Sequence, residues 1–269
     1  MTSRTWYVLA AGEKYVAKLV PAAAQAPFVA GLAVAEHLAA GGIATGPPVR
    51  TASGALALPL GGSVLALLRY QPGEPLDRRD PMDQRSWGDL LGRAHRRLDG
   101  FSHPGLVRWH WVRADAAHLG IEPWVRPAVS AAVDALTRLG LTGRLTYGVL
   151  HGDPAPEAFL LDGRTGRTAL IDWGSACTGP LMYDVASAVM YAGGPERATA
   201  LLDGYLAAGP VGRDELEATL PTLLRFRWAV QADWFAGRIA TRDETGNEDP
   251  RDNWTGLYHA RDSLAARAP

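Results

Sequence analysis

The sequence has little of what several classes of protein require. Cys177 is the single cysteine among 269 residues, which excludes an intramolecular disulfide and a cysteine-built zinc site. No apolar run approaches the length of a membrane span, and no basic-then-apolar segment opens the chain, so we expect a cytoplasmic location. The formal net charge of −1 provides no positive surface field for nucleic acid or an anionic membrane. An ordinary globular protein with a small-molecule or peptide partner is therefore expected.

Lysine is nearly absent. It occurs only at Lys14 and Lys18, in the segment "EKYVAKLV", and every other basic residue is arginine. A lysine ammonium is a compact point charge, whereas the arginine guanidinium is a planar fork, so the two side chains are not interchangeable. Two interpretations stay open. Lys18 lies on an exposed strand edge, or its position requires a compact ammonium group for function.

The order of apolar patterns predicts an α+β protein of two lobes. Residues 1–71 contain two candidate hairpins, with a helical pattern over 27–40 between them. A Pro/Gly-rich stretch, "QPGEPLD", follows and marks the expected boundary. Residues 72–269 are expected to form a larger, mostly helical lobe. Its predicted helices are 86–100, 126–140, 183–208, 214–239 and 254–266.

Two segments carry the candidate chemistry. "YGVLHGDPAPEAFLLDG" (147–163) and "TALIDWGSACTGPLMYDVA" (168–186) each deliver one aspartate at a loop after an apolar run. Phosphoryl transfer needs a group that receives the acceptor proton, a metal ligand, and a cation on the phosphates. Asp153 is the candidate base and Asp172 the candidate metal ligand. In the protein-kinase plan a strand lysine pairs with a helix glutamate, which predicts an ion pair between Lys18 and Glu36.

These segments resemble the aminoglycoside phosphotransferase family. The matching motifs are "HGD", "LIDWG", "YDVA" and the helix "LLGRAHRRLDG", and the resemblance spans roughly residues 14–190. It implies a two-lobed protein-kinase-like fold that binds ATP and Mg²⁺ between the lobes. It also implies a hinge near residues 67–70, where Leu68 and Tyr70 would contact the nucleotide, and an acceptor pocket in the C-terminal lobe.

Two further residues of these motifs are expected to have structural roles. His151 belongs to the catalytic segment, and we expect it to hold the loop through backbone groups rather than to carry a proton. Asp184 precedes the apolar stretch "VASAVMYA" and is expected to cap the N-terminus of a helix.

The sequence departs from the family pattern at one metal position. The family has an asparagine five residues after the catalytic aspartate, and this chain has Ala158 there. Two accounts are open. Glu157 supplies a carboxylate to Mg²⁺, or the site holds one metal through Asp172 and is slow or inactive.

A second departure lies at the front of the chain. Only 17 residues precede Lys18, and Gly12 is the one glycine among them, so a full glycine-rich lid is not expected. The N-terminal lobe is therefore expected to be truncated, with the phosphates poorly covered or with a protein partner that completes the lobe.

The leading function is an ATP-dependent O-phosphotransferase. Its acceptor would be a hydroxyl of a small, antibiotic-like molecule, or a Ser/Thr hydroxyl of a precursor peptide in natural-product biosynthesis. The alternative is a pseudokinase that serves as a binding or scaffold partner, which Ala158 and the missing lid favour.

Overall fold

The molecule is described from a computed structural model that covers residues 3–141 and 145–266. These residues form two compact units, one built from 3–109 and 146–212 and the other from 110–141, 145 and 213–266. The expected boundary between 71 and 77 lies inside the first unit, so the division into lobes at residue 71 stays a prediction.

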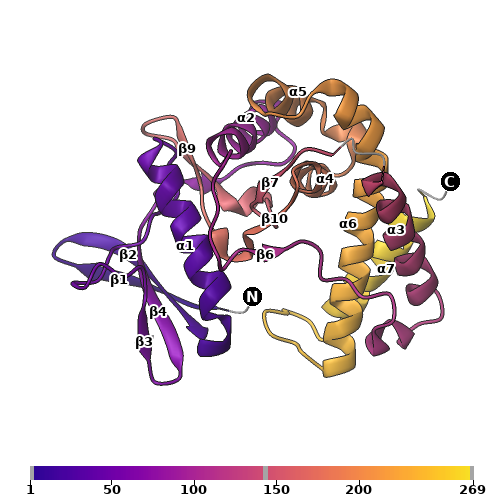
Figure 1. Ribbon diagram of the computed structural model, residues 1–269, viewed down its shortest axis with the longest axis horizontal. Helices are drawn as coiled ribbons and strands as arrows, with labels where there is room; N and C mark the ends of the chain where they lie inside the picture. Colours follow the sequence, from indigo (N-terminus) through magenta and orange to yellow (C-terminus); the bar gives the residue numbers. More distant parts are fainter. Residues whose placement is uncertain (1–2, 142–144, 267–269) are drawn as a thin grey trace. The chain divides into compact units, whose positions relative to one another are not determined.

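The described strands all lie in the first unit, together with four α-helices, and the described part of the second unit is helical (Figure 1). The strands are β1 (Arg4–Ala10), β2 (Glu13–Pro21), β3 (Leu58–Leu60), β4 (Ser63–Arg69), β5 (Glu74–Pro75), β6 (Val107–Arg108), β7 (Tyr147–Leu150), β8 (Phe159–Asp162), β9 (Arg167–Leu170) and β10 (Cys177–Pro180). The α-helices are α1 (Gln25–Ala40), α2 (Pro81–Arg97), α3 (Val125–Gly140), α4 (Met182–Tyr191), α5 (Thr199–Ala208), α6 (Arg213–Thr241) and α7 (Asp252–Ala265). This composition confirms the predicted α+β class.

Two tight hairpins build the N-terminal sheet, which has the strand order β1-β2-β4-β3. The turn between β1 and β2 is Ala11-Gly12, and the turn between β3 and β4 is Gly61-Gly62. All four residues have positive φ, between 51° and 80°. Two-residue hairpin loops need this conformation at both positions, because it matches the right-handed twist of the strands. Both predicted hairpins are thus confirmed.

Helix α1 covers one face of this sheet (Figure 1). Val20, Val64 and Ala66 of the strands form a buried cluster with Phe28 and Leu32 of the helix. Side chains two residues apart on a strand share a face, so Lys18 points to the same side of β2 as Val20. The register of the sheet sets Lys18 opposite Ala66 of this cluster. The ammonium therefore leaves the sheet beside α1.

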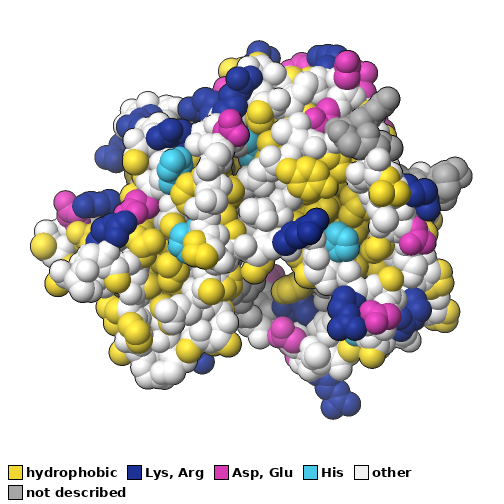
Figure 2. All heavy atoms as spheres, viewed as in Figure 1, with side chains coloured by type: hydrophobic (Ala, Val, Ile, Leu, Met, Phe, Trp, Pro, Cys, Tyr) yellow, Lys and Arg dark blue, Asp and Glu magenta, His cyan; other side chains and the backbone are white. Residues whose placement is uncertain are grey.

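The outer strands of the sheet expose apolar side chains. Figure 2 shows hydrophobic surface gathered over this region. The exposed large side chains are Trp6, Tyr7, Leu9, Leu58 and Leu60. The protein partner expected to complete this lobe stays a prediction.

Helices α2 and α5 pack against each other at glycines. A Cβ atom on Gly88 of α2 would lie 1.9 Å from the Leu201 carbonyl oxygen, and one on Gly204 of α5 would lie 2.3 Å from the Arg85 carbonyl oxygen. Both helices therefore approach each other backbone to backbone. Asp80 begins α2 by accepting the N–H groups of Met82 and Asp83, with a proline at the first helical position. This cap explains why α2 begins five residues before the expected helix.

The prediction of one helix over 183–208 is wrong. Helix α4 ends at Tyr191 and α5 begins at Thr199. Gly193 and Gly194 have φ of 96° and 109°, and Pro195 follows them. This backbone is incompatible with a continuous helix.

The second unit is built from α3, α6 and α7. Helix α6 packs against both others, and the 3₁₀ turn η2 (Ala117–Gly120) lies against α6 through a hydrogen-bonded pair, His118 Nε2 to Asp233 Oδ1 at 2.7 Å. Trp228 of α6 stacks edge-on against His259 of α7. None of the helices in residues 3–141 and 145–266 combines the length and apolarity that a membrane crossing demands.

Candidate functional site

A cavity of about 210 Å³ in the first unit brings together four of the predicted site residues, namely Lys18, Leu68, Asp153 and Asp172. Strand β2 supplies the lysine, and two loops supply the carboxylates. The remaining wall comes from α1, from β4, and from the turn after Asp172. The other lining residues are Ser3, Phe28, Gly31, Leu32, Ala35, Thr45, Trp173, Gly174 and Ser175.

Asp172 and Lys18 form the central ion pair. Lys18 Nζ lies 2.6 Å from Asp172 Oδ1; the lysine side chain is 16% exposed and the aspartate 60%. Asp172 follows β9 and has φ 63° and ψ 56°, a left-handed conformation that is uncommon for a residue with a side chain. Such strain persists where surrounding contacts enforce it, and it is frequent at active sites. One such contact fixes the residue before Asp172, because the Ile171 N–H donates a hydrogen bond to the Ala158 carbonyl oxygen at 2.8 Å.

The surroundings of Asp172 favour its charged form. Desolvation alone would raise the pKa of the carboxyl group, but several interactions outweigh it. The strongest is the attraction and hydrogen bond of the Lys18 ammonium, and His151 and the N–H of Gly174 act in the same direction. The pKa of Asp172 therefore lies below its usual value, as a carboxylate ligand for a cation requires.

The predicted ion pair between Lys18 and Glu36 is wrong. Glu36 lies on α1, and both of its carboxylate oxygens accept hydrogen bonds from the Arg50 guanidinium. Fork-to-fork pairing of this kind is favourable for arginine and holds both oxygens. Lys18 pairs with Asp172 instead.

Asp153 lies in the loop after β7, and its carboxylate is held from α4. The Tyr191 hydroxyl donates a hydrogen bond to Asp153 Oδ1 at 2.6 Å. The other end of the same loop is also bound to α4. The buried carboxylate of Asp184 accepts the N–H of His151 at 2.6 Å and the N–H of Gly152 at 3.0 Å.

The prediction of Asp184 as a helix cap is therefore wrong. Leu181 precedes the first residue of α4, and Asp184 lies inside the first turn. Its carboxylate also lies 3.1 Å from Nε2 of the buried His95, whose Nδ1 is 2.9 Å from the Tyr205 hydroxyl. The whole cluster is buried. Asp184 thus fixes the loop that carries the candidate base.

His151 connects the two aspartate loops. Its Nε2 lies 2.9 Å from the Ile171 carbonyl oxygen, so this nitrogen carries the proton and donates. The ring also packs edge-on against Trp173, with ring centroids 4.7 Å apart. This geometry fits the predicted loop-holding role of His151.

Of the other predicted site residues, one lines the cavity and two do not. Leu68 lines the cavity, as expected for a nucleotide contact. Tyr70 instead packs edge-on with Tyr7 and beneath the Lys14 ammonium, and it is not among the described lining residues. Glu157 is exposed in the 3₁₀ turn η3 (Pro156–Ala158) and does not line the cavity either. The nucleotide and metal roles of these three residues stay predictions.

The donor set suits a magnesium ion that is shared with phosphates. Within residues 3–141 and 145–266, no cluster of three or more His, Cys, Asp or Glu side chains is arranged to hold a metal alone. Mg²⁺ commonly uses one or two carboxylates and takes its other oxygens from substrate phosphates and water. Asp172, which lines this cavity, fits that pattern as the carboxylate ligand.

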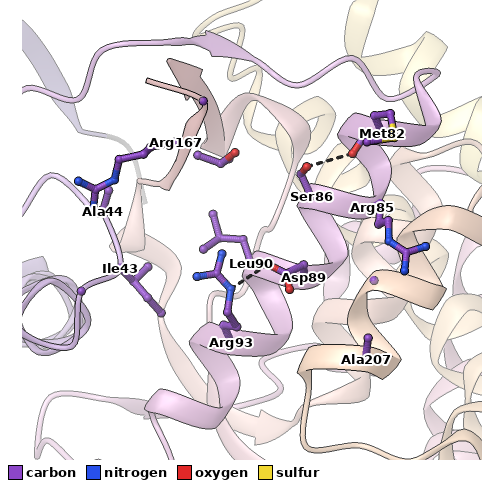
Figure 3. Close-up of a pocket in the computed structure, with 14 residues that line it drawn as sticks. Ile43, Ala44, Met82, Arg85, Ser86, Asp89, Leu90, Arg93, Arg167 and Ala207 are labelled. Carbon is purple, nitrogen blue, oxygen red and sulfur yellow. Dashed lines mark hydrogen bonds and ion pairs between the residues drawn. The ribbon is translucent and has the colours of Figure 1, made fainter. Parts of the chain in front are cut away.

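A larger hollow of about 480 Å³ lies between α2, α5 and the turn before β9. Three arginines line it, Arg85, Arg93 and Arg167, together with Asp89, which pairs with Arg93 at 2.8 Å. Figure 3 shows the guanidinium groups of Arg85 and Arg167 pointing away from each other. Because its charges do not converge and it holds none of the predicted residues, this hollow is not the candidate site.

Sequence reasoning missed Tyr191 and misread Asp184. The two residues are seven positions apart on α4, a spacing that sets side chains on one helix face. That spacing was the signal available in the sequence. The sequence did not indicate which segment packs against this face of α4, because Asp153 is 38 positions away from Tyr191.

Comparison with known proteins identifies the family. Residues 1–219 match the model of the phosphotransferase enzyme family. The chain is 31% identical over 267 residues to a protein named homoserine kinase from Rhizobium etli (strain CIAT 652), covering 90% of this chain and 79% of that protein.

Among solved structures, an amicoumacin kinase aligns with a TM-score of 0.77 at 17% identity, covering 99% of this chain and 86% of that one. A microcompartment-associated aminopropanol kinase aligns with the same score and identity, covering 99% and 91%. These likenesses confirm the predicted kinase-like fold. Asp153 and Asp172, from two of the family motifs, line one cavity, and the chain belongs to the phosphotransferase enzyme family.

Proposed function

We propose that this protein transfers the γ-phosphoryl group of ATP to the hydroxyl of a small amino alcohol. The observation that carries the proposal is the meeting of Lys18, Asp153 and Asp172 at one cavity. A cation for the phosphates, a carboxylate for the metal and a carboxylate for the acceptor proton are the parts that phosphoryl transfer needs.

Each residue has a separate task in this proposal. Lys18 leaves Asp172 and binds phosphate oxygens. Asp172 then binds Mg²⁺, which would neutralise charge that develops on the phosphates. Asp153 accepts the proton of the acceptor hydroxyl as that oxygen attacks. The products of the transfer are the phosphate ester of the acceptor, ADP and one proton.

Similarity favours a small amino alcohol as the acceptor. The relative from Rhizobium etli is named a homoserine kinase, and a structural neighbour is an aminopropanol kinase. Both names denote compounds with a hydroxyl and an amine on a short carbon chain. Homoserine is therefore the first acceptor to test, and a Ser/Thr precursor peptide is the competing acceptor.

The test combines ATP binding with product formation. Calorimetric titration with ATP, with and without Mg²⁺, is performed on the wild type, on Asp172→Asn, and on Asp89→Asn as a surface-carboxylate control. Asparagine tolerates the left-handed backbone of position 172, so this variant removes the charge with little backbone strain. Magnesium-dependent ATP binding is expected in the wild type and control, and its loss is expected in Asp172→Asn.

Product formation is followed as ADP release with homoserine, aminopropanol or a serine-containing peptide. ADP release is expected to be at least 100-fold faster with one amino alcohol than with water alone. If only the peptide accelerated ADP release to this extent, the acceptor would be a peptide hydroxyl and not an amino alcohol. Mg·ATP binding without transfer to any of the three would favour the pseudokinase alternative.

A further inference from the structure

One hydroxyl reaches the candidate base from outside both sequence motifs. Tyr191 is the last residue of α4, and its hydroxyl donates to Asp153 Oδ1 at 2.6 Å. This distance is typical of a hydroxyl that donates to a charged carboxylate, and such bonds are among the stronger ones in proteins.

The loop of Asp153 is held by the same helix at two places. Asp184, seven residues before Tyr191, accepts the N–H groups of His151 and Gly152. This contact fixes the backbone on the N-terminal side of Asp153. A backbone contact does not by itself restrict χ1 or χ2 of Asp153. The Tyr191 hydroxyl acts on the side chain, because it donates to the carboxylate oxygen Oδ1.

The residue five positions after Asp153 acts on this loop through its backbone. Position 158 carries a methyl group, which is buried and has no polar atom to donate or to accept. The backbone of Ala158 is engaged instead, since its carbonyl oxygen accepts the Ile171 N–H. Residue 158 therefore ties the two loops together and does not orient Asp153.

We propose that Tyr191 is a positioning residue, which holds Oδ1 of Asp153 and thereby orients the carboxylate toward the acceptor hydroxyl. This inference rests on the proposed phosphotransferase function. A carboxylate base works only within hydrogen-bonding reach and in the right orientation, so a donor fixed on a helix restricts it to one rotamer. The tyrosine keeps its own proton; the acceptor proton goes to Asp153.

The test is Tyr191→Phe, which deletes one oxygen and keeps the ring. Tyr15→Phe is the matched control, because the Tyr15 hydroxyl also donates to a carboxylate, that of Glu13 at 3.1 Å, away from Asp153. ATP hydrolysis with water as acceptor and phosphorylation of homoserine are both measured. Rates are divided by the concentration of sites that bind ATP in calorimetry, so that unfolded molecules do not count.

In Tyr191→Phe we expect kcat to fall tenfold or more, while the KM for ATP and the melting temperature stay at the wild-type values. A merely structural tyrosine would change stability and the number of binding sites, and it would leave kcat per binding site unchanged. A wild-type kcat per site in Tyr191→Phe would overturn the inference, and so would an equal loss in Tyr15→Phe. A wild type that transfers phosphate to neither water, homoserine nor aminopropanol would instead refute the proposed function, and the inference with it.

Discussion

Replacing Gly31 with alanine tests how tightly α1 is set against the loop of Asp172. A Cβ atom at position 31 would lie 2.2 Å from the Trp173 carbonyl oxygen and 3.0 Å from its carbonyl carbon. Non-bonded heavy atoms are comfortable at about 3.5 Å, so the helix or the loop must move by roughly 1 Å. Both neighbours are backbone, and a change of rotamer cannot relieve the contact.

Two effects of opposite sign determine the stability of this variant. Alanine gains about 1 kcal/mol over glycine inside a helix, and overpacking of this kind costs about 1–3 kcal/mol. The net loss should be at most about 2 kcal/mol, so the variant should fold. Activity is more sensitive, because a displacement of about 1 Å at a catalytic site can cost 100-fold in rate. We therefore expect a large fall in kcat/KM with a small change in stability.

The assay is urea unfolding together with steady-state kinetics, and Gly237→Ala is the control. Gly237 also lies inside a helix, but a Cβ there would meet only His118 Cδ2 at 3.9 Å, an ordinary contact. The control should gain about 0.5–1 kcal/mol in stability. If Gly31→Ala were as stable and as active as Gly237→Ala, the reasoning from the close contact would be refuted.

Three other predictions follow from contacts in the first unit. Glu36→Gln should leave kcat/KM within about twofold of the wild type in steady-state kinetics, because Glu36 pairs with Arg50 and not with the lysine of the site. Asp184→Asn should lower the free energy of unfolding in urea by about 1–3 kcal/mol, because the amide leaves a buried donor of the loop unpaired. Burial, with the charge of Asp184 beside it, raises the pKa of the Cys177 thiol to about 12, so at pH 8 the native protein should resist alkylation and urea-unfolded protein should react. Native reactivity equal to that of unfolded protein would contradict the burial of this thiol.

Local signals in the sequence predicted most elements of the fold. Paired positive-φ turns, apolar periodicity and caps are short-range features, and the hairpins, α1 and α3 lie where these features placed them. The break after Tyr191 was also visible, as the run Gly193-Gly194-Pro195. It was missed because apolar residues continue on both sides of it.

Motif order predicted the meeting of Lys18, Asp153 and Asp172, but not the partner of each side chain. Glu36 sits on the expected helix, yet Arg50, which lies in the loop after that helix, captures its carboxylate. To predict whether Lys18 or Arg50 pairs with Glu36, one must know the path of the loop that carries Arg50. The contacts of Asp184 join residues 32 and 33 positions apart, and no local pattern encodes them.

The ion pair between Lys18 and Asp172 would couple the binding of nucleotide to the binding of metal in the proposed reaction. Phosphate oxygens would have to displace the carboxylate from the ammonium, and a divalent cation would have to displace the ammonium from the carboxylate. Whichever ligand binds first opens the pair for the second. Nucleotide and metal should therefore raise each other's affinity by one common factor, since coupling between two binding equilibria is reciprocal.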